Sequence, residues 1–255
     1  MMNKKLFFPF ICLLYLSSAQ GLTLNGFTGF ASVVKLNGRV TGLVSSIAVK
    51  AGQRVNKGDV LIKLDDTPHQ ASVDRAKALE ESLLPVVQTA QLELERAVEL
   101  YDRDSLSQVA LKNAQNVLAE AEGKYQAATA ERVLAEYQLK NSVMHSPLDG
   151  RVLQLHTNID QYIDPAVNGE PLITLVDSQH MLAIALINSE QWNYALMGKQ
   201  ATIQFGKKAF NGQVSYLGYQ RIEQSSGLPA YEIYISFQTD ELIPAEMPVT
   251  ISISE

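Results

Sequence analysis

The chain has 255 residues, a formal net charge of −6 at pH 7 and only 7% aromatic residues. The negative charge, with no cluster of basic residues, argues against nucleic acid as a partner. The low aromatic content favours a coiled coil and small β domains over a deep substrate pocket, and the length allows one large domain or roughly two to three small ones.

The first residues have the pattern of an export signal. Lys4 and Lys5 give a positively charged start, and residues 6–16 are apolar. This run is about half of the roughly 20 residues that a spanning helix needs. We therefore expect a cleaved signal peptide over residues 1–19. The only cysteine, Cys12, lies inside the apolar run, so the exported chain is expected to lack disulfides and thiolate metal sites.

Residues 20–66 are expected to form an N-terminal strand and the first half of a small β module. From Gly38 to Leu64, short apolar runs alternate with glycine turns, which is typical of short strands. Asp65 and Asp66 follow as turn and helix-start residues.

Residues 67–141 carry two runs of a heptad pattern, in which apolar or compatible residues recur at alternating steps of three and four. The pattern positions are 73, 76, 80, 83, 87, 90, 94, 97 and 101, and then 111, 114, 118, 121, 125, 128, 132, 135 and 139. Opposing positions sum to the same number, as Val73 with Ala135 and Ala97 with Leu111 do. We therefore expect an antiparallel helical hairpin with its tip near Asp104.

The first helix has a start signal and an internal proline. Thr67 is expected to be its N-cap, Pro68 its first residue and Gln70 the reciprocal residue of a capping box. Pro85 costs an interior helix about 3 kcal/mol. Because the heptad pattern continues in register past Pro85, we expect a kink there rather than a helix end.

Two seam positions are charged, Glu80 and Arg132. They lie about one turn apart across the pair of helices, so they are expected to face each other. The alternative is that both side chains extend to solvent.

The β pattern resumes after the hairpin, over residues 142–178, and repeats the earlier one. The matching segments are Gly38-Arg39-Val40 with Gly150-Arg151-Val152, Gln53-Arg54-Val55 with Gln161-Tyr162-Ile163, and residues 58–64 with residues 169–175. Similar half-domains on both sides of a hairpin predict one β-sandwich built from both, with the hairpin inserted between them.

Residues 179–255 predict a small β-barrel with one short helix. The helix is expected over residues 189–197, closed by Gly198. The expected strands cover residues 182–187, 201–205, 213–217, 231–237 and 249–253.

In this order of parts, the sequence resembles the periplasmic adaptor subunits, or HlyD-like membrane fusion proteins, of Gram-negative RND-type efflux pumps. The split module, residues 38–65 and 146–175, is similar to the two halves of a biotinyl or lipoyl domain. The resemblance implies an α+β fold in which a long coiled-coil hairpin is inserted in a split lipoyl-like β-sandwich and a small β-barrel domain follows.

The hairpin tip carries a more specific resemblance. The family has Arg-Leu-x-x-Leu, then Ser, then Leu, and Arg96, Leu100, Ser107 and Leu111 occupy these positions, with Ala97 in place of the second leucine. In the family this tip docks on the mouth of an outer-membrane channel, which implies a partner-binding role for these four residues. From the residues alone, the leucines also fit packing inside the hairpin, and Ser107 also fits a helix N-cap.

The resemblance implies a non-enzymatic adaptor in the periplasm, associated with an inner-membrane transporter, expected to be RND-type, and linked to an outer-membrane channel. Six copies would form a funnel. The sequence ends after the barrel, without the membrane-proximal domain of larger members, so transporter contact is expected to rest on the barrel and lipoyl-like domains. Two alternatives remain: an adaptor for an ATP-driven secretion system or macrolide-type exporter, and a structural envelope coiled coil.

No catalytic, cofactor or metal site is expected. The four histidines, His69, His145, His156 and His180, lack metal-ligand spacing. No glycine-rich phosphate loop and no nucleophile elbow occurs. The turn that bears the modified lysine in lipoyl and biotinyl carriers is replaced here by the hairpin.

Overall fold

The computed structural model describes residues 21–167, 169–177, 179–223, 229–241 and 243–254. The expected signal peptide and Cys12 lie outside these residues. The chain divides into two compact units. One consists of residues 32–177, and the other of residues 1–31 and 178–255.

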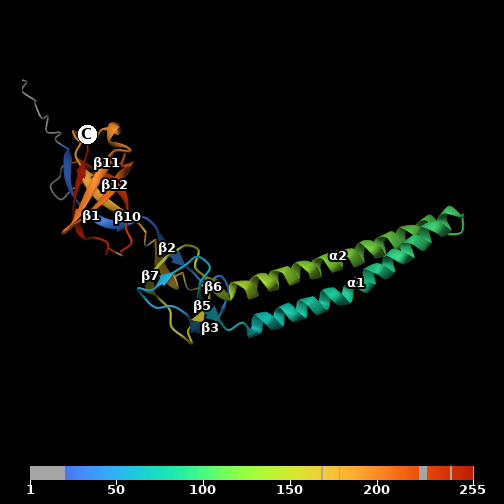
Figure 1. Ribbon diagram of the computed structural model, residues 1–255. Coiled ribbons are helices and arrows are strands. Elements are labelled where there is room, and N and C mark those ends of the chain that lie inside the picture. Colours follow the sequence, from blue (N-terminus) through green and yellow to red (C-terminus); the bar gives the residue numbers. More distant parts are fainter. Residues whose placement is uncertain (1–20, 168, 178, 224–228, 242, 255) are drawn as a thin grey trace, which may run out of the picture. The chain divides into compact units, whose positions relative to one another are not determined.

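The unit that contains the C-terminal region is a small antiparallel β-barrel. Its sheet has seven strands in the order β10-β1-β15-β11-β12-β14-β13, and an additional pairing of β10 with β14 closes six of them into a ring. The strands, which Figure 1 shows, are β1 (Leu22–Phe30), β10 (His180–Ile187), β11 (Gln200–Phe205), β12 (Lys208–Leu217), β13 (Ile222–Glu223), β14 (Pro229–Gln238) and β15 (Pro248–Ile253). Each strand expected in this region is confirmed, and most are longer than expected.

Alternate residues of these strands fill the barrel interior, as antiparallel pairing requires. Seven large side chains there are fully buried: Met181, Ile187, Ile203, Leu217, Ile233, Ile235 and Ile251. Burying each such side chain stabilises a fold by roughly 1.5–3 kcal/mol.

β1 lies in a different sheet from the one that its place in the sequence suggests. The sequence predicts an N-terminal strand and the first sandwich half over residues 20–66. The N-terminal strand, β1, pairs instead with β10 and β15 of the barrel. Gly26 permits this, because a Cβ atom there would lie 2.3 Å from the carbonyl oxygen of Ile184. The strand is not interrupted at Gly26. The glycine is needed because the two backbones approach closely there, and not because the chain turns.

The short helix expected over residues 189–197 is wrong in extent. Only Tyr194–Leu196 are helical, as the 3₁₀-helix η1, and residues 189–191 form a separate turn. The Asn188 side-chain oxygen accepts from the Gln191 N–H at 2.8 Å, and the Asn193 oxygen accepts from the Ala195 N–H at 2.9 Å. These side-chain bonds to the backbone compete with a continuous helix. Gly198 follows with φ +78°, as a closing glycine should.

The unit of residues 32–177 contains a sandwich of two four-stranded sheets. Their orders are β2-β9-β7-β4 and β6-β5-β3-β8. The strands are β2 (Val33–Leu36), β3 (Gly42–Ile47), β4 (Arg54–Val55), β5 (Val60–Leu64), β6 (Val143–His145), β7 (Gly150–Leu155), β8 (Tyr162–Ile163) and β9 (Ile173–Val176). Each sheet takes two strands from either side of the hairpin, which confirms that one sandwich is built from both halves.

The two halves are related by an internal repeat in which equivalent residues of β2–β4 and β6–β8 differ by 108 positions, while those of β5 and β9 differ by 111. The pair Gly42–Ile163 of β3 and β8 corresponds to the pair Gly150–Val55 of β7 and β4. β-Bulges also recur at equivalent places in the β3–β5 and β7–β9 ladders. Gly42, rather than Gly38, is therefore the equivalent of Gly150, and the expected match between Gly38 and Gly150 is wrong by four residues.

The hairpin consists of α1 (Thr67–Asp102) and α2 (Gln108–Asn141), which lie side by side and are joined at the end away from the strands (Figure 1). Every expected seam position is buried or half-buried except Tyr101, which is exposed. The most buried seam residues are Val73 and six alanines, at 76, 90, 97, 121, 128 and 135. The heptad seam is therefore confirmed, and small residues along it let the two helices approach closely.

The start of α1 corrects the expected capping box. The N-cap is Asp66, whose side chain makes no capping hydrogen bond. The Asp65 carboxylate instead accepts from the Thr67 N–H at 3.1 Å, and hydrogen bonding from Thr67 lowers the pKa of the Asp65 carboxyl. The Gln70 side chain donates to Asp74 rather than reaching back to the cap. The start of the helix is thus fixed one to two residues earlier than the pattern suggested, with help from the carboxylate of Asp65, which directly follows β5.

Pro85 lies within α1, and the helix continues on both sides of it. The Thr89 hydroxyl donates to the Pro85 carbonyl at 2.8 Å. The expectation that the helix does not end at Pro85 is confirmed, and the kink stays a prediction.

Candidate partner-binding site

The hairpin tip is a tight turn held by backbone hydrogen bonds. The N–H of Ser105 donates to the Leu100 carbonyl at 2.8 Å, and the N–H of Asp104 donates to the Tyr101 carbonyl at 2.9 Å. Together these bonds form a Schellman motif at the end of α1. Its left-handed position is filled by Asp104, with φ 54°, where glycine is the usual choice. The turn therefore satisfies α1's last carbonyls within the chain.

Ser107 begins the second helix as its N-cap. Its hydroxyl oxygen accepts from the Ala110 N–H at 3.2 Å, and its backbone is extended. The capping role that its residue type suggested is present in the structure. The Ser107 side chain is also exposed, so a partner can reach it. Partner contact at this position stays a prediction.

Arg96 and Leu100 lie on the outside of α1 near its end. The Arg96 guanidinium pairs with Glu93 three residues earlier, and its side chain is 69% exposed. Leu100 is 45% exposed, so it is not sequestered in the seam. Ala97, where the family has leucine, is buried. Both Arg96 and Leu100 are thus accessible to a partner, while the substitution at Ala97 falls on the seam.

A shallow groove of about 430 Å³ follows α2 from the tip, and the structure brings Leu111 into it. Its lining residues are Tyr101, Gln108, Val109, Leu111, Lys112, Asn113 and Gln115. Arg96, Leu100 and Ser107 are not among them. Val109, which sequence reasoning missed, is 71% exposed. An apolar residue off the seam in the first turn of a helix was the signal that could have identified it.

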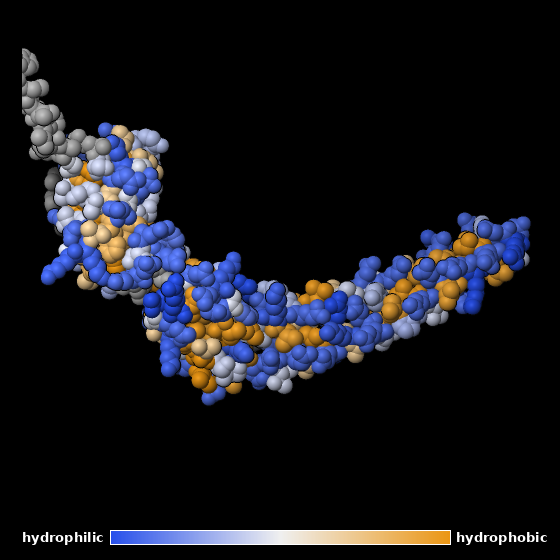
Figure 2. All heavy atoms as spheres, viewed as in Figure 1, coloured by the Kyte–Doolittle hydropathy of each residue, from blue (hydrophilic) through white to orange (hydrophobic). Residues whose placement is uncertain are grey.

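Exposed apolar side chains continue along the hairpin, as Figure 2 shows in orange. Of the 25 large hydrophobic residues that are exposed in the described part of the chain, 12 lie on α1 and α2. They are Leu79, Leu84, Val86, Leu92, Val98, Leu100, Tyr101, Val109, Val117, Val133, Leu134 and Tyr137. So many exposed apolar side chains on one element are typical of a surface that contacts other molecules.

A charged network crosses the seam between the tip and the sandwich. Arg132 Nε donates to Glu80 at 2.6 Å, so the two charged seam residues face each other as expected. The Thr129 hydroxyl donates to the other Glu80 oxygen at 2.7 Å, and Arg132 also pairs with Glu136 at 2.9 Å. Hydrogen bonds from Thr129 and then Arg132 lower the pKa of the Glu80 carboxyl. The seam accommodates this charge pair because Glu80 and Arg132 both have hydrogen-bonding partners there.

Three of the four histidines have ordinary structural partners. His69 Nε2 lies 3.0 Å from the Thr41 carbonyl, and His156 Nε2 lies 2.9 Å from the Thr174 hydroxyl. His180 lies 3.3 Å from the Gln238 amide. Among the residues that the structure describes, no group of three or more His, Cys, Asp or Glu side chains is placed to hold a metal ion.

Within the described part of the chain, neither long helix has an apolar stretch of the length that a membrane crossing requires.

The sequence of residues 32–176 matches the family described as "RND MFP, barrel-sandwich hybrid domain". This stretch is more than half of the chain, and it contains the sandwich and the whole hairpin.

Individual proteins agree with this match. An uncharacterized protein, YdhJ of Escherichia coli K12, is 28% identical over 76% of this chain and 68% of its own length. The multidrug resistance protein MdtN of the same organism is 23% identical over 78% of this chain and 73% of its own length. The membrane fusion protein Spr0693 of Streptococcus pneumoniae R6 has the same fold, with a TM-score of 0.70 at 17% identity over 92% of this chain and 99% of that one.

Proposed function

Because the chain belongs to the RND membrane fusion protein family, whose members are non-enzymatic adaptors of efflux pumps, we propose that it links an inner-membrane transporter to an outer-membrane channel. In this proposal the hairpin tip docks on the channel through Arg96, Leu100, Ser107 and Leu111, together with Val109.

The observation that carries this proposal is the exposed apolar surface at the end of the hairpin. Val109 and Leu100 are large apolar residues that face solvent, and Val109 lines the same groove as Leu111. A soluble helical pair has no internal need for such side chains at its tip, and they lose their contact with water when a partner covers them.

Further parts of the proposal rest on the family. We propose an RND-type transporter as the inner-membrane partner and a hexamer as the working assembly, in which the exposed apolar residues along α1 and α2 pack against neighbouring hairpins. We also propose export to the periplasm by the signal peptide of residues 1–19. Similarity to MdtN, a multidrug resistance protein, supports efflux over the secretion and scaffold alternatives.

The domain boundaries are likewise proposals. We place the hairpin at residues 67–141, the second lipoyl-like half at residues 142–178 and the barrel at residues 179–255. β1 is added to the barrel because it pairs with β10 and β15, which leaves residues 32–66 as the first lipoyl-like half.

Site-specific crosslinking in cells tests the docking. Cys12 is the only cysteine, so Val109→Cys introduces a single reactive thiol outside the signal segment. We expect a bifunctional maleimide to join Val109→Cys to an outer-membrane channel that mass spectrometry identifies. Val133→Cys, also exposed on α2 but far along the helix from the tip, is the matched control and should not capture the channel. Equal capture from both positions, or none from Val109→Cys, would contradict tip docking.

A second measurement tests the efflux role itself. A strain that lacks the protein should be more sensitive to at least some compounds of a broad drug and metal panel, and the wild-type gene should restore resistance. Unchanged sensitivity across the panel would favour a structural envelope role instead.

A further inference from the structure

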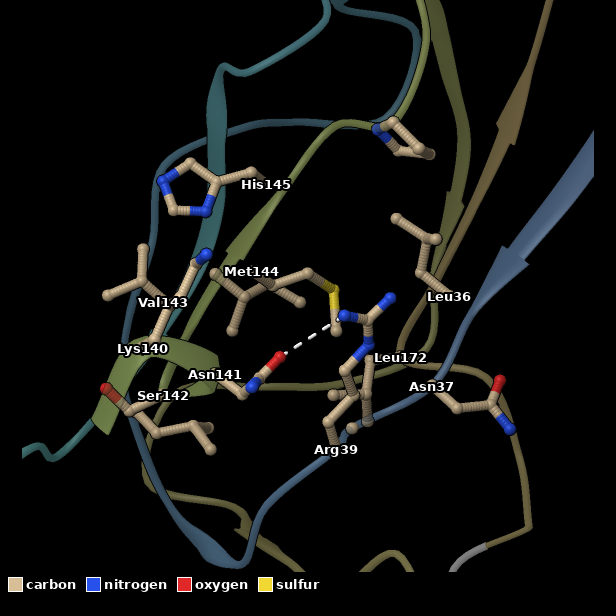
Figure 3. A pocket seen from close by; sticks show the side chains of 14 residues that line it. Leu36, Asn37, Arg39, Lys140, Asn141, Ser142, Val143, Met144, His145 and Leu172 are labelled. Atoms are coloured by element: carbon tan, nitrogen blue, oxygen red, sulfur yellow. Dashed lines mark hydrogen bonds between the residues drawn. The ribbon is translucent and has the colours of Figure 1, made fainter. Parts of the chain in front are cut away.

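A cavity of about 210 Å³ lies where the end of α2 meets the sandwich. It occupies the open side of the sandwich, between the edge strands β2 and β6 of the two sheets. Figure 3 shows it from close by. All of its lining residues belong to the unit of residues 32–177.

The cavity has an apolar side, built from both halves of the internal repeat, and a polar side, which consists mainly of residues 37–39 and 140–142. Leu36 of β2 and Met144 of β6 differ by 108 positions, so they are equivalent residues on the two edge strands. Ile62, Leu64 and Leu172, all buried, complete the apolar lining. The repeat therefore creates a preformed hydrophobic space.

The repeat does not extend to the charges at this cavity. Arg39 corresponds to Pro147, and both line the cavity. The Arg39 guanidinium points into the space beside Met144 and donates a hydrogen bond to the Asn141 side-chain oxygen at 3.2 Å (Figure 3). Lys140, from the last turn of α2, adds a second cation.

These two cations lack counterions. In the described part of the chain, neither Arg39 nor Lys140 forms an ion pair. No carboxylate is among the lining residues of the cavity. In a protein with a net charge of −6, two unneutralised cations at an apolar cavity favour a negatively charged ligand.

We propose that this cavity binds a small organic anion with a compact apolar body, of the class of monocyclic aromatic carboxylates. An apolar cavity of about 150 Å³ holds benzene, so the space of about 210 Å³ accommodates one ring with a carboxylate. The ring packs against Leu36, Met144 and Leu172, and the carboxylate binds the Arg39 guanidinium, which presents a fork of N–H donors.

Binding at this position affects the contact between hairpin and sandwich. The hydrogen bond from the Arg39 guanidinium to the uncharged Asn141 amide joins the sandwich to the last residue of α2. A carboxylate competes for the same guanidinium and forms a stronger bond, because both partners are then charged. A ligand in the cavity thus replaces the Arg39–Asn141 hydrogen bond at the base of the hairpin.

Methyl NMR of the full exported chain with ¹³C-methyl methionine provides the test, with benzoate as the probe. We expect a saturable shift of the Met144 methyl signal, while Met181, buried inside the barrel, does not shift. Benzyl alcohol, which has the ring without the charge, should bind roughly tenfold more weakly, because a hydrogen bond to a charged group is worth about 1.5–3 kcal/mol.

Matched charge variants complete the experiment. Arg39→Gln should weaken benzoate binding roughly tenfold, and Lys140→Gln, on the exposed side of α2, should weaken it less. Arg54→Gln makes the same charge change on β4, at the opposite edge of the sheet from β2, and should leave binding unchanged. The proposal is overturned if Met144 shows no saturable shift at millimolar benzoate, if benzyl alcohol binds equally well, or if Arg39→Gln and Lys140→Gln both bind as the wild type does.

Discussion

The sandwich and the hairpin share one compact unit but are stabilised in different ways. The sandwich buries large aliphatic side chains completely, among them Leu61, Ile173 and Leu175. The most buried residues of the hairpin are mostly alanines, and its large apolar residues other than Val73 are half-buried or exposed. The sandwich therefore holds most of this unit's hydrophobic stabilisation, whereas the hairpin is stabilised by a long series of small contacts.

This difference suits the sandwich and the hairpin to different roles. A hairpin whose most buried seam residues are mostly alanines leaves many of its larger apolar residues exposed and available to partners. A compact sandwich fixes both ends of the hairpin, because the strands that precede and follow it, β5 and β6, pair with each other. The insertion can thus carry the proposed docking surface far from the sandwich core without disturbing the fold that supports it.

The largest effect is expected from a cavity in the sandwich core. Leu61→Ala should destabilise the sandwich by about 2–5 kcal/mol, since Leu61 is fully buried. Leu84→Ala, at an exposed position of α1, should cost no more than about 0.5 kcal/mol. Hydrogen exchange of the β3 and β5 amides in urea measures the difference. Equal losses for the two variants would remove the contrast between the regions.

Overpacking the hairpin seam is expected to have the next largest effect. Ala128→Leu places a large side chain where the two helices approach closely, and it should destabilise the hairpin by about 1–3 kcal/mol. Ala127→Leu makes the same change at the neighbouring exposed position and should be nearly neutral. The thermal transition of circular dichroism at 222 nm reports on the hairpin, because α1 and α2 are the only α-helices in the described residues.

A glycine in α2 offers a gain of stability. A Cβ atom at Gly123 would meet no heavy atom within 4 Å, so Gly123→Ala should stabilise the hairpin by about 1 kcal/mol through helix propensity. The opposite sign is expected for Gly26→Ala in the barrel, where the added Cβ clashes with the Ile184 carbonyl. Thermal unfolding of both variants checks the two signs, and a loss at Gly123→Ala would show that the helix surface is more crowded than the structure indicates.

The smallest effect is expected at the charged pair of the seam, which is partly exposed. Glu80→Ala and Arg132→Ala should each lower the melting temperature, and the double variant should lose less than the sum of the two because the partners contact each other. Simple additivity would exclude coupling between them.

The same pair has a defined pH dependence. The pKa of Glu80 in the folded chain is below its ordinary value of 4.5. Its contribution to stability is therefore complete above that ordinary value and is lost as the pH falls through the lower, folded-state pKa. Glu80→Gln should remove this part of the acid sensitivity of the 222 nm transition, and an unchanged acid profile would contradict the assignment.

The sequence by itself determined the hairpin and the strands. Heptad spacing gave the seam from Val73 to Leu139, because residues three and four apart lie on one face of any α-helix regardless of what surrounds it. The repeat on both sides of the hairpin likewise indicated one sandwich. Among the candidate site residues, the sequence also indicated that Ser107 suits a helix cap, which the structure confirms.

Only the tertiary structure decided which distant segments meet. β1 joins the barrel because Gly26 admits the backbone of β10, and no local pattern carries that information. The N-cap of α1 is Asp66, and the neighbouring Asp65 binds the first helical N–H, because the end of β5 sets the direction in which the chain enters the helix. The cavity likewise needs Leu36, Arg39 and Met144 side by side. They lie up to 108 positions apart, and strand pairing alone brings them together, because periodicity fixes which face a residue occupies but not the partner that it faces.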